Sequence, residues 1–188
     1  MFTKVTKFDG EYQAMHTLMG DITQDSCKQA IQWIIDCNMN DASNPDEPRP
    51  DILNLIISSD GGDFYAAFAL IDFIASSHIP VRTIATGVVA SCGLFISMSG
   101  TPGHRVATPN TSFLSHHFSA ESEGNNYQLM SQLKGFKDSN KILVNHYKKH
   151  TGLTEKEILD NLLRPVDVYL NANEAKSYRL CDVVKNLN

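Results

Sequence analysis

Long apolar runs alternate with amphipathic stretches along the chain, and this alternation predicts the order of its elements. Residues 52–58 (ILNLIIS) and 79–87 (IPVRTIATG) are almost continuously apolar, which is typical of strands buried on both faces of a parallel sheet. Between them, residues 64–77 (FYAAFALIDFIASS) are apolar nearly all round, which predicts a well-buried helix. A strand, a helix and a second strand in this order predict a βαβ unit and therefore an α/β fold.

The remaining pattern predicts shorter strands and several more helices. A strand at 16–22 leads into a helix that runs to about Cys37, for which Asp25 or Ser26 is the expected N-cap. Further expected elements are a short helix at 91–100, two short strands within 104–117, a long helix at about 126–150, a helix at 154–163 with a Thr154–Glu157 capping box, and a last helix at 171–180.

The chain is long enough for one domain with a substantial core, and we expect a single domain over residues 1–188. The segment 39–51 holds three prolines and several Asn and Asp residues, so it is expected to be an exposed, inserted loop. Its length is unusual for a connection inside a compact domain.

Composition narrows the classes of function. The net charge is −5 and no block of Lys and Arg stands out, which argues against a nucleic-acid-binding protein. No apolar stretch is long enough to span a membrane, and the N-terminal residues do not have the pattern of a signal peptide. The four cysteines are scattered without a CxxC pair, so neither a zinc site nor a disulfide framework is expected. These features predict a reduced, cytoplasmic protein.

The first predicted turn of chemical interest is the glycine pair Gly61-Gly62, which follows one buried strand and precedes a helix. Paired glycines allow a sharp turn and leave backbone N–H groups exposed, where they can bind an anion or an oxyanion formed during a reaction. A plain tight turn explains the motif equally well, and the spacing fits neither GxGxxG nor a phosphate-binding loop.

The second such turn is GVVASCGLF at 87–95, where Ser91 lies between a buried strand and a helix. Taken alone, Ser91 is better explained as the N-cap of that helix than as a nucleophile, because the spacing differs from G-x-S-x-G. A nucleophilic serine would need a histidine base and a carboxylate to orient it. Of the seven histidines, His116 follows a predicted strand, and spacing alone does not select the carboxylate.

Four separated motifs, in the same order, resemble the ClpP family, the proteolytic subunits of the ATP-dependent Clp proteases. ISSDGG is similar to the family's I-N-S-P-G-G, and GVVASCGLF to G-x-A-A-S-M-G-A-F. RVATPNTSFLSHH is similar to R-x-x-L-P-N-S-x-x-M-I-H-Q. HTGLTEKEI and VDVYLNANEAKSYRLCD are similar to H-T-G-x-x-x-x-x-I and R-D-x-F-x-x-A-x-E-A-x-x-Y-G-L-x-D. The resemblance covers about Met15 to the C-terminus.

The resemblance implies a serine endopeptidase that degrades unfolded polypeptides. It implies Ser91 as the nucleophile, His116 as the general base and acid, and Asp167 as the carboxylate that orients the imidazole. The backbone N–H groups of Gly62 and Cys92 would form the oxyanion hole, with Gly61 and Gly62 also binding the substrate. Neither a metal nor a cofactor is implied.

The resemblance also implies a ClpP/crotonase-like fold, with repeated βαβ units and a projecting handle helix at about 126–150. Family members form homo-oligomers, in which two heptameric rings stack as a tetradecamer, and an AAA+ unfoldase feeds the chamber. Three departures lie close to functional positions. Asp60 replaces the family's proline before Gly-Gly, His117 replaces a glutamine after the base, and Val166 replaces an arginine before Asp167.

Two alternatives remain open. The first is an inactive or regulatory subunit of a Clp-type ring, although the chain keeps a residue of the right type at each triad position. A crotonase-like enzyme acting on acyl-CoA would share the fold and the oxyanion amides. That chemistry usually recruits a Glu or Asp near the oxyanion hole and would give Ser91, His116 and Asp167 no purpose.

Overall fold

The computed structural model describes residues 4–39 and 48–187, so most of the loop expected at 39–51 lies outside the described residues. The described chain forms two compact units. The first combines the described parts of Met1–Leu114 and Leu170–Asn188, and the second is the continuous segment Ser115–Tyr169.

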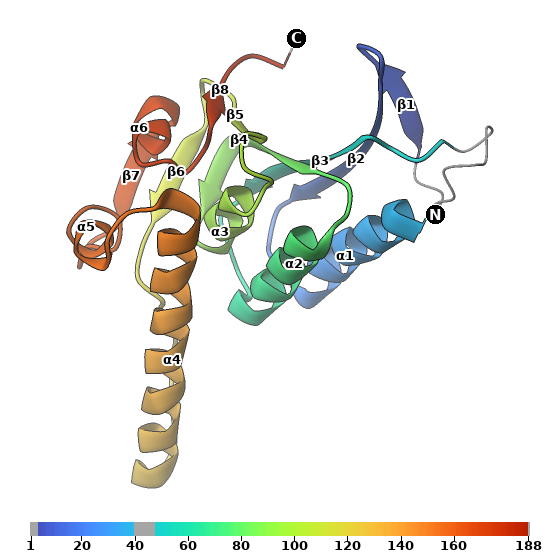
Figure 1. Cartoon of the computed structure of the whole chain (residues 1–188). Coiled ribbons are helices and arrows are strands. Elements are labelled where there is room, and N and C mark those ends of the chain that lie inside the picture. Colours follow the sequence, from blue (N-terminus) through green and yellow to red (C-terminus); the bar gives the residue numbers. More distant parts are fainter. Residues whose placement is uncertain (1–3, 40–47, 188) are drawn as a thin grey trace. The chain divides into compact units, whose positions relative to one another are not determined.

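The first unit is built on a largely parallel sheet (Figure 1). Its strands follow the order β1-β2-β3-β4-β5-β8, and β6 pairs with the end of β4. All of these pairings are parallel except the one between β1 and β2, which confirms the parallel sheet predicted from the buried apolar runs. The strands are β1 (Val5–Phe8), β2 (Glu11–Met19), β3 (Ile52–Ser59), β4 (Val81–Ala90), β5 (Arg105–Ala107), β6 (Ser112–Ser115) and β8 (Val183–Val184). A further strand, β7 (Val168–Asn171), includes the boundary between the two units.

Four helices belong to this unit: α1 (Gln24–Met39), α2 (Phe64–Ser76), α3 (Cys92–Met98) and α6 (Ala172–Ser177). Figure 1 shows α1 and α2 side by side, and the two helices pack against each other. The buried face of α1 follows helical spacing and consists of Cys27, Ala30, Trp33, Ile34 and Cys37. At the start of α2, the Asp63 carboxylate accepts the backbone N–H of Ala66 at 2.9 Å and so caps the helix.

The N-terminal hairpin of β1 and β2 was not expected from the apolar pattern, which placed the first strand at 16–22. The signal for it is the dipeptide Asp9-Gly10, whose φ angles of 49° and 88° are both positive. Asn-Gly and Asp-Gly pairs favour this left-handed geometry in two-residue hairpin turns. The apolar pattern hides the hairpin because β1 is mostly exposed and therefore has no buried face to mark it.

The start of α1 also differs from the expectation that Asp25 or Ser26 caps it. The Thr23 hydroxyl accepts the N–H of Ser26 at 3.1 Å, and the Ser26 hydroxyl accepts the N–H of Thr23 at 2.9 Å. This reciprocal arrangement makes Thr23 the cap, with Ser26 in the role that Glu or Gln usually has in a capping box.

Strand β4 continues three residues beyond Gly87, where the sequence pattern had ended it. The register between β3 and β4 shifts after Ile57, since Ile57 pairs with Ala85 whereas Ser59 pairs with Val89. Gly87 lies in this irregular stretch with a φ of 61°, which a glycine adopts without strain. The bulge lengthens β4 to Ala90 and so places Ser91 directly at its carboxyl end.

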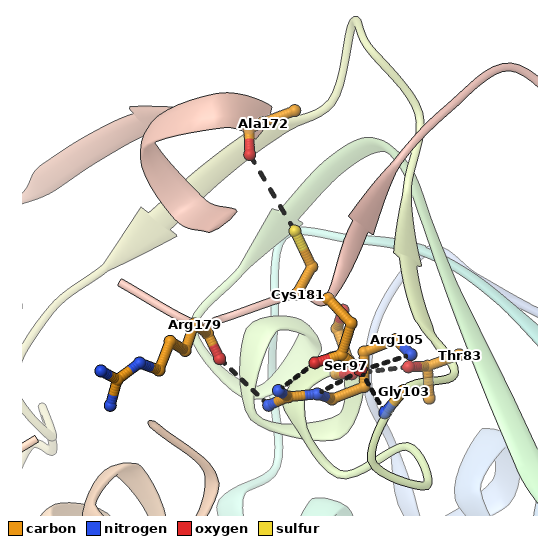
Figure 2. Close-up of polar contacts among 8 residues, drawn as sticks. Thr83, Ser97, Gly103, Arg105, Ala172, Arg179 and Cys181 are labelled. Atoms are coloured by element: carbon orange, nitrogen blue, oxygen red, sulfur yellow. Dashed lines mark hydrogen bonds and ion pairs between the residues drawn. The ribbon is translucent and has the colours of Figure 1, made fainter. Parts of the chain in front are cut away.

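The C-terminal segment is tied to β5 by an ion pair between the buried Arg105 and the partly buried Asp182. The Asp182 carboxylate also accepts the backbone N–H groups of Gly103 and Arg105, at 2.8 and 3.0 Å. A further guanidinium N–H of Arg105 donates to the carbonyl of Arg179 at 3.0 Å, as Figure 2 shows. These bonds satisfy a buried arginine and hold β8 against β5.

The second unit contains α4 (Asn126–Thr151) and α5 (Glu155–Asn161). Asn125 and Gln128 form a capping box at the start of α4, and Gly152 ends the helix in a left-handed conformation with a φ of 68°. The buried residues of α4 all lie in its C-terminal half, from Ser139 onwards. This helix matches the handle expected at 126–150. The Thr154–Glu157 capping box predicted for α5 is also confirmed.

Within the described ranges, no helix is both long enough and apolar enough to cross a membrane. The same ranges contain no cluster of three His, Cys, Asp or Glu side chains that could hold a metal ion. All four cysteines are buried thiols that form no disulfide.

Candidate functional site

The two strand-to-helix turns singled out in the sequence meet within the first unit. A Cβ atom placed on Gly61 would lie 2.7 Å from the Cβ of Ser91 and 3.2 Å from its hydroxyl oxygen. Only a glycine allows this approach, because real Cβ contacts are longer and because the φ of Gly61 is 113°. The structure therefore brings Gly61 and Ser91 into direct contact.

Ser91 has an unusual backbone conformation, with φ of 51° and ψ of −121°. Its side chain makes no capping hydrogen bond to α3, although it occupies the N-cap position. The N-cap explanation favoured by the local sequence is therefore wrong for the side chain. Such a conformation costs about 1–3 kcal/mol in a residue with a side chain, and it is found chiefly at functional sites. The backbone N–H of Ser91 is anchored to the carbonyl of Leu114 on β6, at 3.0 Å.

The Gly61-Gly62 turn is fixed in space by Ile22. The N–H of Ile22 donates to the carbonyl of Gly61 at 2.8 Å, and the N–H of Asp63 donates to the carbonyl of Ile22 at 2.7 Å. In a planar trans peptide the C=O and N–H point in opposite directions. The Gly62 N–H therefore points away from Ile22, and so does the Gly62 carbonyl. A Cβ on Gly62 would lie 2.2 Å from the Ile22 carbonyl oxygen, so this residue too must be glycine.

Cys92 joins the second turn to the first. Its thiol donates a hydrogen bond to the carbonyl of Gly62, with a sulfur–oxygen distance of 3.2 Å. The side chain is buried, and this burial raises the pKa of Cys92 to about 11, so the thiol is protonated at neutral pH. Because Cys92 is the first residue of α3, its own N–H has no acceptor within the helix. The N–H groups of Gly62 and Cys92 thus belong to two segments that the thiol connects.

His116 lies in the second unit, where its Nδ1 contacts the carbonyl of His117 at 2.5 Å. A carbonyl oxygen only accepts hydrogen bonds, so Nδ1 carries the proton in the neutral ring. Nε2 is then the unprotonated nitrogen, which is the one that a general base offers to a hydroxyl.

A buried network fixes the backbone immediately before His116. The Ser115 hydroxyl donates to the carbonyl of Leu162 at 2.6 Å, and it lies 2.6 Å from the hydroxyl of Tyr147. Since Ser115 has only one proton to donate, the Tyr147 hydroxyl is the donor between them. Burial raises the pKa of Tyr147 far above its ordinary value, which keeps this donor protonated. This network could not be predicted from the sequence, because its members are 15 to 47 residues apart.

Asp167 is exposed in the second unit. Within the described part of the chain it makes no hydrogen bond or ion pair, so it is not bonded to His116 in this structure. The site residues expected from the sequence are thus grouped only in part. Gly61, Gly62, Ser91 and Cys92 are brought together in the first unit, and the relation of His116 and Asp167 to them stays a prediction.

Comparisons with known proteins point to one family. A model of the Clp protease family matches residues 14–187. The ATP-dependent Clp protease proteolytic subunit of Deinococcus radiodurans is 33% identical over 144 residues, which cover 77% of this chain and 68% of that protein. The corresponding protein of Pleurastrum terricola is 27% identical over 169 residues, or 89% and 81% of the two chains. Proteolytic subunit 2 of Corynebacterium efficiens is 32% identical over 142 residues, or 76% and 70%. The chain belongs to the Clp protease family.

Proposed function

We propose that this chain is a serine endopeptidase that cleaves unfolded polypeptides, with Ser91 as its nucleophile. The observation that carries the proposal is the backbone of Ser91, whose φ of 51° and ψ of −121° are combined with a hydroxyl that makes no capping bond. A serine in a plain N-cap has an extended backbone and uses its side chain to bond the helix. The strained geometry instead resembles that of a serine presented at a sharp strand-to-helix turn for attack on a substrate.

In the proposed reaction, the Ser91 hydroxyl attacks the carbonyl carbon of the peptide bond while Nε2 of His116 accepts its proton. The N–H groups of Gly62 and Cys92 stabilise the oxyanion of the tetrahedral intermediate. His116 then donates the proton to the departing amine, which leaves an acyl-enzyme. Water, activated by the same imidazole, hydrolyses this ester and regenerates Ser91.

Chain connectivity supports the pairing of Ser91 with His116. The carbonyl of Leu114 accepts the Ser91 N–H, and His116 follows Leu114 by only two residues. Since consecutive Cα atoms are 3.8 Å apart, the Cα of His116 lies within about 7.6 Å of the Cα of Leu114, whatever the conformation between them.

The Asp167 carboxylate completes the proposed triad by replacing the His117 carbonyl at Nδ1 of His116. Both acceptors favour the same tautomer, with the proton on Nδ1. The carboxylate adds stabilisation of the imidazolium that forms during the reaction, which a neutral carbonyl provides less well. Activation therefore requires that the His116–His117 contact opens.

The test uses Ser91→Ala and a fluorophosphonate probe that reacts with activated serines. We expect the wild-type particle to be labelled at Ser91 and to cleave peptides, and Ser91→Ala to lose both properties while it assembles normally. Peptidase activity that persists undiminished in Ser91→Ala would refute the proposal. His116→Ala and Asp167→Ala are expected to reduce labelling through loss of the base and of its orienting group.

One observation favours a second candidate, an inactive or regulatory subunit of a Clp-type ring. His116 is bonded to His117, and Asp167 is exposed without a bonding partner among the described residues. A subunit that never exchanges these contacts would not activate Ser91. Failure of the probe to label Ser91 in the assembled particle would support this candidate.

The proposed assembly is a homo-oligomer of heptameric rings stacked as a tetradecamer, fed by an AAA+ unfoldase. The relatives are named as subunits of ATP-dependent proteases, which supports an ATPase partner. The exposed N-terminal half of α4 supports a role in contacts between rings. The cytoplasmic location expected from the sequence stays a prediction.

A further inference from the structure

The thiol of Cys92 lies within the site, where it interacts with the Ser91 side chain as well as with the backbone of Gly62. It is 2% exposed, and its hydrogen bond reaches the carbonyl of Gly62 from the neighbouring turn. The proposed reaction uses only the backbone N–H of this residue. The side chain therefore has a role that the mechanism leaves unexplained.

Hydrogen bonds with Ile22 hold the Gly61-Gly62 turn, and the Cys92 thiol connects that turn to the one that carries Ser91. Ile22 fixes the peptides on both sides of Gly62 from one direction, through its N–H and its carbonyl. Cys92 bonds the Gly62 carbonyl from the opposite direction. The peptide between Gly62 and Asp63 is therefore held at both ends, by Ile22 at its N–H and by Cys92 at its C=O.

This bond also links the two segments that carry the proposed oxyanion donors. The Gly62 N–H points to the same side as the Gly62 carbonyl, because both point away from Ile22. The Cys92 thiol and the Cys92 N–H belong to one residue. A fixed distance from that thiol to the Gly62 carbonyl consequently restricts the distance between the two N–H groups.

We propose that the Cys92 thiol is a positioning residue, which sets the separation and orientation of the Gly62 and Cys92 N–H groups in the oxyanion hole. This inference rests on the proposed serine-peptidase function. The thiol acts through the Gly62 peptide and takes no part in bond making or proton transfer. It is suited to this role as a neutral donor, because its burial keeps it protonated at neutral pH.

Cys181 supplies a matched control elsewhere in the first unit. It is also 2% exposed, burial also raises its pKa to about 11, and its thiol also faces a backbone carbonyl, that of Ala172 at 3.9 Å (Figure 2). Cys181→Ala and Cys92→Ala thus remove the same buried group. Only Cys92→Ala removes a bond between the two turns of the site.

The experiment compares Cys92→Ala, Cys92→Ser and Cys181→Ala with the wild type by affinity for a peptidyl boronate. This probe forms a tetrahedral anion on the serine, whereas a matched peptide amide, measured on the Ser91→Ala background, reports ground-state binding. We expect Cys92→Ala to bind the boronate roughly tenfold more weakly, with amide binding unchanged, because donors displaced by a fraction of an ångström stabilise the anion less. Cys181→Ala is expected to match the wild type in both assays.

Cys92→Ser tests the bond rather than the volume of the side chain. Its hydroxyl donates to the same carbonyl but lies closer to Cβ than sulfur does, so we expect it to restore part of the lost boronate affinity. If Cys92→Ala fails to fold, Cys92→Ser alone provides the test. We expect its boronate affinity to lie below that of the wild type but by less than tenfold. Boronate affinity equal to that of the wild type in the folded Cys92 variants would overturn the inference.

Failure of the inference and failure of the proposed function give different results. If the function is wrong, fluorophosphonate does not label Ser91 in the wild-type particle, and both proposals fall. If only the inference is wrong, wild type and Cys92→Ala are labelled at the same rate.

The S–H stretching band supplies a readout independent of activity, since a hydrogen-bonded thiol absorbs at lower frequency. We expect the band missing from Cys92→Ala to lie below the one missing from Cys181→Ala, and the reverse order would contradict the bond.

Discussion

At the scale of single residues, Ser91 has a strained backbone that costs free energy, and its neighbours hold it in that conformation. Its backbone lies outside the regions that residues with a side chain usually adopt, and Leu114 and the tight contact with Gly61 hold it there. Strain of this kind persists only where the surrounding structure enforces it. Substitutions at Ser91 should therefore affect stability, through backbone strain, independently of their effect on activity, through the hydroxyl.

Two variants test the strain, because both lack the hydroxyl and differ only in conformational freedom. Ser91→Gly adopts a positive φ without penalty, whereas Ser91→Ala keeps the Cβ that causes it. We expect Ser91→Gly to be about 1 kcal/mol more stable than Ser91→Ala in urea unfolding. Equal stabilities, or a more stable alanine variant, would show that the position is not strained.

Gly61→Ala tests the close approach of the two turns. The added Cβ would meet Ser91 at 2.7 Å, so we expect a loss of about 3 kcal/mol in the free energy of unfolding and at least tenfold slower fluorophosphonate labelling. Gly10→Ala is the control, since Gly10 has a φ of 88° but no heavy atom within 4 Å of the added Cβ. The control should lose stability without a change in the labelling rate. Labelling reduced equally in both variants would argue against a specific contact at the site.

At the scale of elements, the βαβ core could be predicted because its strands carry their own signal. β3 and the N-terminal part of β4 are buried along most of their length, and their continuous apolar runs predict this burial directly. The only sequence signal for the β1–β2 hairpin is the dipeptide Asp9-Gly10, and β8 has almost no sequence signal of its own. A two-residue strand such as β8 depends on its partner β5 rather than on its own side chains.

In the candidate site, too, features with a local sequence signal could be predicted, and features that depend on distant segments could not. Motif resemblance pointed to Gly61, Gly62 and Ser91, and the glycine requirement at Gly61 and Gly62 has a local sequence signal. The backbone angles of Ser91 and the bond from Cys92 to Gly62 could not be predicted, because both arise when segments 30 residues apart approach each other. The Ser115–Tyr147 network was missed for the same reason.

The attachment of β8 to β5 leads to a prediction on pH. Burial alone would raise the pKa of Asp182, but hydrogen bonds from the Arg105 side chain and from backbone N–H groups outweigh it and hold the pKa below its usual value. The folded state thus favours the charged carboxylate more than the unfolded state does. Its contribution to stability is present above the unfolded pKa of about 4 and is lost as the pH falls through the lower folded value.

We expect Asp182→Asn to unfold about 2 kcal/mol more easily than the wild type at pH 7, since a charged hydrogen-bonded group is removed. The difference should narrow below about pH 4 in thermal melts, because the wild type then loses the same charge. Asp160→Asn is the control, as Asp160 pairs with Lys156 at an exposed position where an ion pair contributes little. A difference that stays constant down to pH 2 would contradict the assignment.

At the scale of the whole molecule, the N-terminal half of α4 exposes large apolar side chains that a monomer has no reason to expose. Tyr127 is 86% exposed, Met130 64% and Leu133 48%, and their spacing of three residues places them along one side of the helix. Aligned apolar residues of this kind are typical of surfaces that become buried in an assembly. In the proposed tetradecamer they would contact the opposite ring.

Leu133→Asp tests this role of α4. We expect it to shift the particle mass in light scattering from fourteen chains to seven or fewer, with the helical circular dichroism of the chain unchanged. Ser131→Asp introduces the same charge two residues away on a different side of α4 and should leave the mass as in the wild type. A Leu133→Asp particle of wild-type mass would exclude this part of α4 from the ring contact.

The ion pair of Arg105 and Asp182 also affects the order in which the protein can be made. Its two members are 77 residues apart, so a ribosome releases the arginine long before its acceptor. Until the carboxylate emerges, the guanidinium has no counter-ion to enter the core with, and an unpaired charge is costly to bury. The first unit therefore cannot close before Asp182 has left the ribosome, even though most of its strands are already synthesised. Until then its apolar surfaces and unpaired strand edges stay exposed, which favours aggregation.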